Sequence, residues 1–115
     1  MDILQKVNFK ELKKLYLCDN KISDIKILEK AKFEKLEKLY LGINKISHIN
    51  ILEKVNFKEL KKLYLYNNKI SDIKVLEKVK FDKLEILKLD HNQISKEENQ
   101  SLIKKLKSKI KQFDI

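Results

Sequence analysis

Leucine and isoleucine recur along this chain at fixed offsets, and the same offsets return every 24 residues. Within each period two leucines flank one amphipathic or charged residue, as in Leu15-Tyr16-Leu17. This alternation is typical of a short strand with one buried face. An asparagine follows, and apolar residues such as Ile25 and Leu28 then recur at helical or 3₁₀ spacing between lysines and glutamates. Each period therefore predicts a strand, a turn and a short helical return.

Three 24-residue blocks align without gaps and account for most of the chain. They cover residues 12–35, 36–59 and 60–83, and the first and third agree at 19 of their 24 positions. A terminal repeat and its cap occupy 84–115, while residues 1–11 match the back half of a block. No block can bury its own apolar side, so neighbouring blocks are expected to stack around one continuous core. The 115 residues are therefore interpreted as one domain.

One pattern of leucines and asparagines, L-x-x-L-x-L-x-x-N-x-L, recurs in the three blocks and in the terminal repeat. It is met by Leu12, Leu15, Leu17, Asn20 and Ile22; by Leu36, Leu39, Leu41, Asn44 and Ile46; by Leu60, Leu63, Leu65, Asn68 and Ile70; and by Leu84, Leu87, Leu89, Asn92 and Ile94. This pattern resembles the leucine-rich repeat family, over essentially the whole chain. The N-x-I-S-x-I motif is most similar to the subclass found in phosphatase-regulating and internalin-type proteins. The resemblance implies an α/β repeat solenoid, a right-handed superhelix with a parallel concave β-sheet, short helical convex returns and a C-terminal capping helix.

Three further residue types recur once per period, and each has a structural explanation. The asparagines are expected to bond backbone groups at the turns of two adjacent repeats. The serines are expected to cap the helical returns, and the phenylalanines to form a column of the core. These residues are Asn20, Asn44, Asn68 and Asn92; Ser23, Ser47, Ser71 and Ser95; and Phe9, Phe33, Phe57 and Phe81.

The C-terminal segment predicts one longer amphipathic helix at about 96–109. Ser95 followed by Glu98 forms a capping box, which places acidic residues in the first turn and lysines in the last. Such a basic helix also suits a membrane surface or a calmodulin-like partner. A lid over the end of the stack is favoured, because a solenoid needs a polar-faced cap. A fifth short strand is expected at about 112–115. The apolar face of the helix consists of Leu102, Ile103, Leu106 and Ile110.

The chain is strongly basic, with a formal net charge of +10. This charge suits a polyanion partner, although abundant Lys, Ile and Asn also suit a genome with AT-rich codons. All 27 basic residues are lysines, and the absence of arginine argues against a specialised nucleic-acid reader. The sequence shows no signal-peptide pattern and no apolar stretch of membrane length. Because the single cysteine, Cys18, fits a reducing compartment, a cytoplasmic or nuclear location is expected.

Catalytic, metal and cofactor sites are not expected. Cys18 and His91 lie three repeats apart, on the order of 14 Å, which is too far for a thiolate–imidazole pair. His48 has no second ligand at metal spacing. Gly42 is the only glycine, so a glycine-rich phosphate loop cannot form. The chain is therefore expected not to be an enzyme.

Residues that alternate with the buried leucines are expected to form columns on the concave face. One column is rich in tyrosine, its neighbour is rich in lysine, and a flanking column alternates lysine and glutamate. The two positions after the second leucine differ in every block, although the frame around them is copied, as expected for a binding surface on a fixed scaffold. The expected partner-binding residues are Lys14, Tyr16, Lys38, Tyr40, Lys62, Tyr64, Tyr66, Asn67, Lys88, Asp90 and His91.

These columns predict a non-catalytic protein–protein interaction module that binds an acidic protein or peptide surface. Tyr16, Tyr40 and Tyr64 would be its anchors. The structural alternative is that the tyrosines stack on one another and on lysine stems only to stabilise the sheet. The functional alternatives are lysine-driven nucleic-acid binding and a designed or truncated scaffold with no partner of its own. Self-association through the N-terminal edge is a further expectation, whereas a membrane partner is not expected.

Overall fold

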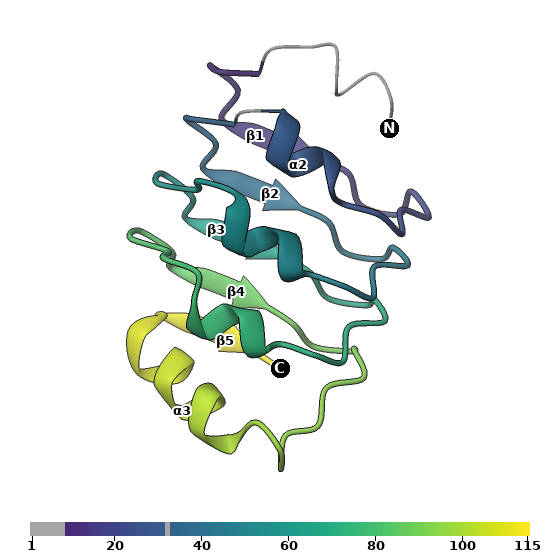
Figure 1. The fold of residues 1–115 in the computed structure, drawn as a ribbon, viewed down its shortest axis with the longest axis vertical. Coiled ribbons are helices and arrows are strands. Elements are labelled where there is room, and N and C mark those ends of the chain that lie inside the picture. Colours follow the sequence, from purple (N-terminus) through teal and green to yellow (C-terminus); the bar gives the residue numbers. More distant parts are fainter. Residues whose placement is uncertain (1–8, 32) are drawn as a thin grey trace.

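The computed structural model describes residues 9–31 and 33–115, which form a solenoid around one parallel sheet (Figure 1). The strand, turn and helical return predicted for each period are confirmed. The partial repeat expected over residues 1–11 falls mainly outside the described part of the chain. Five strands pair in chain order, namely β1 (Lys14–Tyr16), β2 (Lys38–Tyr40), β3 (Lys62–Tyr64), β4 (Ile86–Lys88) and β5 (Gln112–Asp114). The helical elements are α2 (Ile27–Lys30), η1 (Asn50–Lys54), η2 (Lys74–Glu77) and α3 (Gln100–Lys109).

One apolar residue at the centre of each strand, buried in β2 to β4 and partly buried in β1 and β5, fixes the register of the sheet. Leu39, Leu63 and Leu87 are 0% exposed and are register partners, and Phe113 takes this place in β5. The fifth strand expected at the C-terminal end is thereby confirmed. A slip of one residue would turn every central residue out of the core and bury its charged neighbours. The flanking residues of each strand therefore lie on the opposite, concave face.

The helical returns cover the other face of the sheet with apolar side chains. Leu28, Leu52 and Leu76 come from successive returns, and each is at most 4% exposed. The α2 segment is a single α-helical turn, whereas η1 and η2 are 3₁₀-helices, as the sequence spacing allowed. The predicted phenylalanine column lies in this core, with Phe33 and Phe57 buried and Phe9 and Phe81 partly buried.

The serine caps predicted for these returns are wrong. Lys26, Ile49 and Ile73 occupy the N-cap positions, and none of them makes a side-chain capping bond. An aspartate provides the local bond instead, since Asp24 Oδ1 accepts from the Lys26 N–H at 2.9 Å and Asp72 makes the same bond in the third block. A carboxylate two residues before an N–H closes an Asx turn, and each serine lies one residue further back. The serines concerned are Ser23, Ser47 and Ser71.

Three of the four turn asparagines, Asn44, Asn68 and Asn92, each join two repeats, as predicted. Asn20 differs, because in the described part of the chain its side chain bonds the Cys18 carbonyl of its own turn. Asn44 Oδ1 accepts from the backbone N–H of Asn20 at 2.9 Å and of Ile22 at 3.0 Å. Its Nδ2 donates to the Leu17 carbonyl in the preceding repeat at 3.0 Å and to carbonyls of its own turn. One block later Asn68 Oδ1 accepts from the Ile46 N–H and its Nδ2 donates to the Leu41 and Leu65 carbonyls, and both asparagine side chains are buried. The ladder satisfies turn backbone groups that water cannot reach.

The α3 helix covers the C-terminal end of the stack (Figure 1). Leu102, Leu106 and Ile110 are 5–7% exposed and join the hydrophobic core, while Ile103 on the same face is half-buried. The apolar stripe is therefore used inside the protein, which confirms the lid and leaves little of this face for a membrane or a partner helix.

The start of this helix differs from the prediction. It begins at Gln100, and residues 96–99 form a turn, so no acidic residue lies in its first turn. Ser95 Oγ accepts from the Glu98 N–H at 3.3 Å, as a capping serine would. The Ser95 carbonyl, however, accepts the Asn99 side-chain amide at 2.7 Å. In a helix that started near residue 96, the Ser95 carbonyl would accept the backbone N–H of Asn99. Here it accepts the Asn99 side chain instead.

Candidate functional site

Three tyrosines stack on the concave face, one from each of the first three strands. Tyr16, Tyr40 and Tyr64 are register partners, and their ring centroids lie 4.4 and 4.6 Å apart at interplanar angles of 10° and 8°. Adjacent strands are about 4.8 Å apart, so the sheet itself holds the rings in contact. Tyr16 is 61% exposed, whereas the other two are half-buried. We call these three residues the tyrosine stack.

A fourth tyrosine, Tyr66, meets the stack edge-on. Its ring centroid is 6.4 Å from that of Tyr64, with the planes at 90°. The ring also crosses Gly42 in the preceding repeat, where an added Cβ would lie 2.4 Å from Tyr66 Cζ. Gly42 has no positive φ, so its function is to leave room for this ring. Tyr66 therefore joins the second and third repeats on the concave surface.

Burial raises the pKa of two of these tyrosines. For Tyr40 the largest cause is partial burial, followed by the neighbouring Tyr16 hydroxyl. For Tyr66 partial burial again comes first, and the nearby Cys18 thiol also raises the pKa. Both effects disfavour the phenolate. Both hydroxyls therefore remain neutral near pH 7 and can donate as well as accept hydrogen bonds.

A row of lysines runs beside the tyrosine stack. Lys14, Lys38 and Lys62 begin β1, β2 and β3 and are register partners, and we call them the lysine row. None of them forms an ion pair with another residue in the described part of the chain. The lysine row therefore places unbalanced positive charge on the concave face. The flanking column alternates in sign through Lys13, Glu37, Lys61 and Glu85.

The charge of the face changes at β4. Lys88 stands where the earlier strands carry tyrosine, with its Nζ 5.6 Å from the Tyr64 ring centroid and 3.8 Å from an Asp114 oxygen. Asp90 follows, with Oδ2 3.8 Å from His91 Nε2 and Oδ1 buried without a hydrogen-bond partner. The charge of Lys88 is thus partly balanced within the protein, and a carboxylate lies beside it.

The turn residues that differ among the repeats share one backbone constraint. Asp19, Ile43, Asn67 and His91 all have φ between 52° and 59°, in the left-handed region. Asp, Asn and His tolerate this region better than other non-glycine residues, whereas a β-branched residue is strained there. Ile43 is also 45% exposed. The side chain at this position varies between repeats, but the backbone conformation does not.

We expect Ile43→Asn to raise the free energy of unfolding by about 1 kcal/mol, because it removes left-handed strain. Asn67 adopts nearly the same φ in the next repeat, 52° against 54°, so asparagine suits this backbone. Urea unfolding followed by circular dichroism measures the change. Ile43→Val keeps the β-branch and is the control, for which no gain is expected. Equal stability of the asparagine variant and the wild type would contradict the interpretation.

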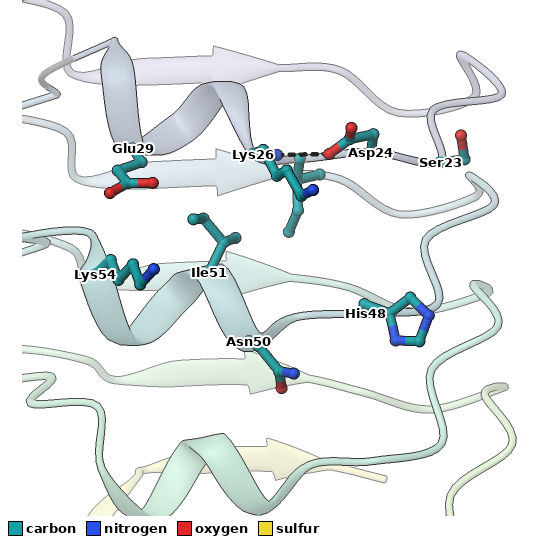
Figure 2. Close-up of a pocket in the computed structure, with 9 residues that line it drawn as sticks. Ser23, Asp24, Lys26, Glu29, His48, Asn50, Ile51 and Lys54 are labelled. Carbon is teal, nitrogen blue, oxygen red and sulfur yellow. Dashed lines mark hydrogen bonds between the residues drawn. The ribbon is translucent and has the colours of Figure 1, made fainter.

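A hollow lies on the convex side between α2 and η1, and Figure 2 shows its lining. His48 occupies the position held by Asp24 one repeat earlier, so the Asx bond to the Lys26 backbone has no counterpart there. The lining mixes both signs of charge and contains none of the residues predicted to bind a partner. It consists of Ser23, Asp24, Ile25, Lys26, Glu29, His48, Asn50, Ile51 and Lys54.

Other kinds of site are missing from residues 9–31 and 33–115. No three His, Cys, Asp or Glu side chains there lie close enough together to hold a metal ion. No helix in this part of the chain has the length and apolar character needed to cross a membrane. Cys18 is a free, partly exposed thiol.

The predicted binding residues divide into two groups in the structure. The four lysines and the tyrosine stack lie within the strands, and Tyr66 and Asp90 lie two residues after β3 and β4. Asn67 and His91 lie in the turns with exposed side chains. Sequence reasoning missed the structural role of Gly42 and the contact of Asp114 with Lys88. The only sequence signal for the role of Gly42 was a lone glycine among larger residues in the same column. The contact between Asp114 and Lys88 required the register of β5, which follows α3, a longer helix than the returns of the other repeats.

Comparison with known proteins agrees with this architecture. The family described as Leucine Rich repeats (2 copies) matches residues 10–54 and 58–112. An internalin C2 from Listeria monocytogenes shares 32% identity and a TM-score of 0.63, over 75% of this chain and 35% of that one. An internalin (inlF) from the same organism shares 29% identity and a TM-score of 0.70, over 92% of this chain and 29% of that one.

The chain thus spans about a third of the length of these two solved proteins. No curated protein sequence matches it. The repeated leucines, the asparagine ladder, the parallel sheet and the family match all lead to one assignment. This chain belongs to the leucine-rich repeat family.

Proposed function

We propose that this chain is a non-catalytic module that binds a protein partner on its concave face. The observation that carries the proposal is a cluster of four tyrosines on the open face of the sheet, beside the lysine row. Leucine-rich repeat domains are typically protein-interaction modules, and they are generally not enzymes. On the concave face, as far as the structure describes the chain, large aromatic side chains and lysines without ion pairs occur together.

Stacking makes the tyrosines better suited to binding. Tyrosine combines a large apolar ring with a polar hydroxyl, which favours it at protein interfaces. The sheet fixes the rings of Tyr16, Tyr40 and Tyr64, and Tyr66 contacts them from the side. Side chains that are already ordered lose little conformational entropy when a partner binds. The stabilising ladder and the interface are therefore compatible.

An acidic protein surface is the partner that the lysine row favours. Three adjacent lysines without ion pairs repel one another, and an acidic partner would relieve this repulsion. The flanking column balances its own charges, so the lysine row determines the sign of this part of the face.

Nucleic-acid binding is less well supported by the same geometry. Proteins that bind single strands stack bases on open aromatic faces. Here the faces of Tyr40 lie against Tyr16 and Tyr64, and the outer face of Tyr64 is close to Lys88. The carboxylates of Asp90 and Asp114 near the end of the tyrosine stack would also repel phosphates.

Two charge-reversal variants test the proposal. The first replaces Lys14, Lys38 and Lys62 by glutamate. The control reverses three exposed lysines of the convex side that are also spaced by 24 residues, Lys30, Lys54 and Lys78, and changes the net charge equally. Each protein is used as bait in nuclease-treated extract of the cells that produce the chain, and circular dichroism verifies that each is folded.

A partner retained by the wild type and the convex variant, but lost by the concave variant, is the expected result. Equal loss with both variants would mean that net charge alone drives binding. No retained protein with the wild type would favour a scaffold without a partner.

A further inference from the structure

We propose that the concave face binds an extended peptide in one orientation, with acidic side chains over the lysine row and one basic side chain on Asp90. This inference rests on the proposed function and adds the direction in which the partner peptide lies across the face. It follows from three observations, namely the unpaired lysine row, the incompletely bonded carboxylate of Asp90, and the tyrosine stack between them.

Asp90 lacks the partners that a partly buried carboxylate needs. Its Oδ1 is buried with no donor, and its Oδ2 lies 3.8 Å from His91 Nε2, beyond hydrogen-bond distance. The nearby Asn67 N–H donates to the Asp90 backbone carbonyl and not to its side chain. Partly buried carboxylates are normally bonded or paired. The Asp90 side chain is 35% exposed, so an ammonium or guanidinium group from a partner would pair with the carboxylate from the solvent side, through Oδ2 rather than the buried Oδ1.

The lysine row and Asp90 lie on opposite sides of the tyrosine stack. The lysines begin their strands, whereas Asp90 lies four residues after the start of β4. From a rise of about 3.3 Å per residue and a strand spacing of about 4.8 Å, the Cα of Asp90 is roughly 14 Å from that of Lys62 and roughly 20 Å from that of Lys14. An extended peptide covers these distances with about four to six residues.

The geometry therefore specifies the chemistry of the ligand. Acidic residues would pair with the lysine row, apolar or aromatic residues would contact the tyrosine stack, and Lys or Arg would follow about four to six positions from the acidic residues. A nucleic acid carries no cation for Asp90 and would be repelled by it. The same carboxylate that attracts a basic side chain also excludes the reversed orientation, in which an acidic residue would face it.

A library of random 12-residue peptides displayed on phage tests the inference. Selection is performed on the wild type, on Asp90→Asn and on Asp82→Asn, an exposed aspartate in the loop before β4. Wild type and Asp82→Asn are expected to enrich acidic peptides with Lys or Arg at the stated spacing. Asp90→Asn is expected to enrich acidic residues without the basic one. Circular dichroism verifies the fold of each protein.

Binding of one selected peptide and of two variants of it, with alanine or glutamate in place of the basic residue, gives the quantitative test. Replacing its basic residue by alanine should weaken binding to wild type about 5- to 10-fold and leave binding to Asp90→Asn unchanged. A glutamate at the same position should bind Asp90→Lys more tightly than wild type, which tests the pairing even if Asp90→Asn proves unstable.

Four results would overturn the inference, and they fall into two kinds that differ in what they imply. Acidic peptides selected without a basic residue, or an equal effect of the alanine replacement on both proteins, would overturn the orientation and leave concave-face binding intact. Peptides that bind equally well after charge reversal of the lysine row, or the absence of any selected peptide, would overturn the inference together with the proposed function.

Discussion

Asn44→Ala is expected to lower the free energy of unfolding by about 3–5 kcal/mol, because it leaves several buried backbone groups without partners. The Asn44 side chain bonds Asn20 and Ile22 through Oδ1, and the Leu17 carbonyl through Nδ2. Alanine replaces none of these bonds, and the turn is too buried for water to replace them all. Because the lost bonds join two repeats, the substitution also weakens the coupling between them.

The matched control is Asn20→Ala, at the same position one repeat earlier. Asn20 is exposed, and within residues 9–31 and 33–115 its side chain makes one bond, from Nδ2 to the Cys18 carbonyl at 2.9 Å. We expect a loss of less than about 1 kcal/mol there. Urea unfolding, followed by circular dichroism and tyrosine fluorescence, measures both variants. Similar losses at the two positions would contradict the assignment of the ladder as an inter-repeat contact.

Leu63→Ala is expected to lower the free energy of unfolding by about 3–4 kcal/mol. Leu63 is 0% exposed at the centre of β3, between Leu39 and Leu87 of the adjacent strands. Truncation leaves a cavity that neighbours on both sides line, and close-packed repeats relax only partly to fill it. Since each repeat is stabilised mainly by its neighbours, damage in the middle affects both halves of the stack.

Leu15→Ala is the control for this substitution, because Leu15 holds the same position in β1 and is only partly buried. The expected loss is about 1–2 kcal/mol. Native-state hydrogen exchange shows which amides lose protection. The loss should extend to the repeats on both sides of Leu63 for the first variant, but remain near β1 for Leu15→Ala. If both variants lost the same free energy of unfolding, the idea that the central leucines couple adjacent repeats would be contradicted.

The fold could be predicted from the sequence because two regular patterns are superimposed in it: the alternation of residues within each strand and the 24-residue repeat. Alternation within Leu15-Tyr16-Leu17 assigns the inner and outer faces of a strand, and the 24-residue repeat places equivalent residues of adjacent strands in register. Both signals are local or strictly periodic, so no knowledge of distant contacts was needed. The asparagine ladder followed for the same reason, since only a bonded asparagine is stable at a buried turn.

The candidate site was only partly determined in this way. The columns of tyrosine and lysine follow from register, and the structure contains both. The sequence did not determine that Tyr66 would cross Gly42, that Lys88 would meet Asp114, or that Asp90 would keep an oxygen without a donor. These features depend on side-chain rotamers and on contacts between residues of different repeats, which no single-repeat pattern encodes.

Sequence alone determined the strands, the turns, the core leucines and the two concave columns of this protein, because each depends on hydrophobic period and on repeat length. Tertiary structure decided the details in which local groups compete. Lys88 meets Asp114 because β5 pairs with β4, and Ile43 holds a left-handed backbone in a turn where its N–H donates to the Tyr66 carbonyl of the next repeat. Such outcomes depend on which donor or packing contact is closest in three dimensions, and that is fixed only when the repeats have stacked.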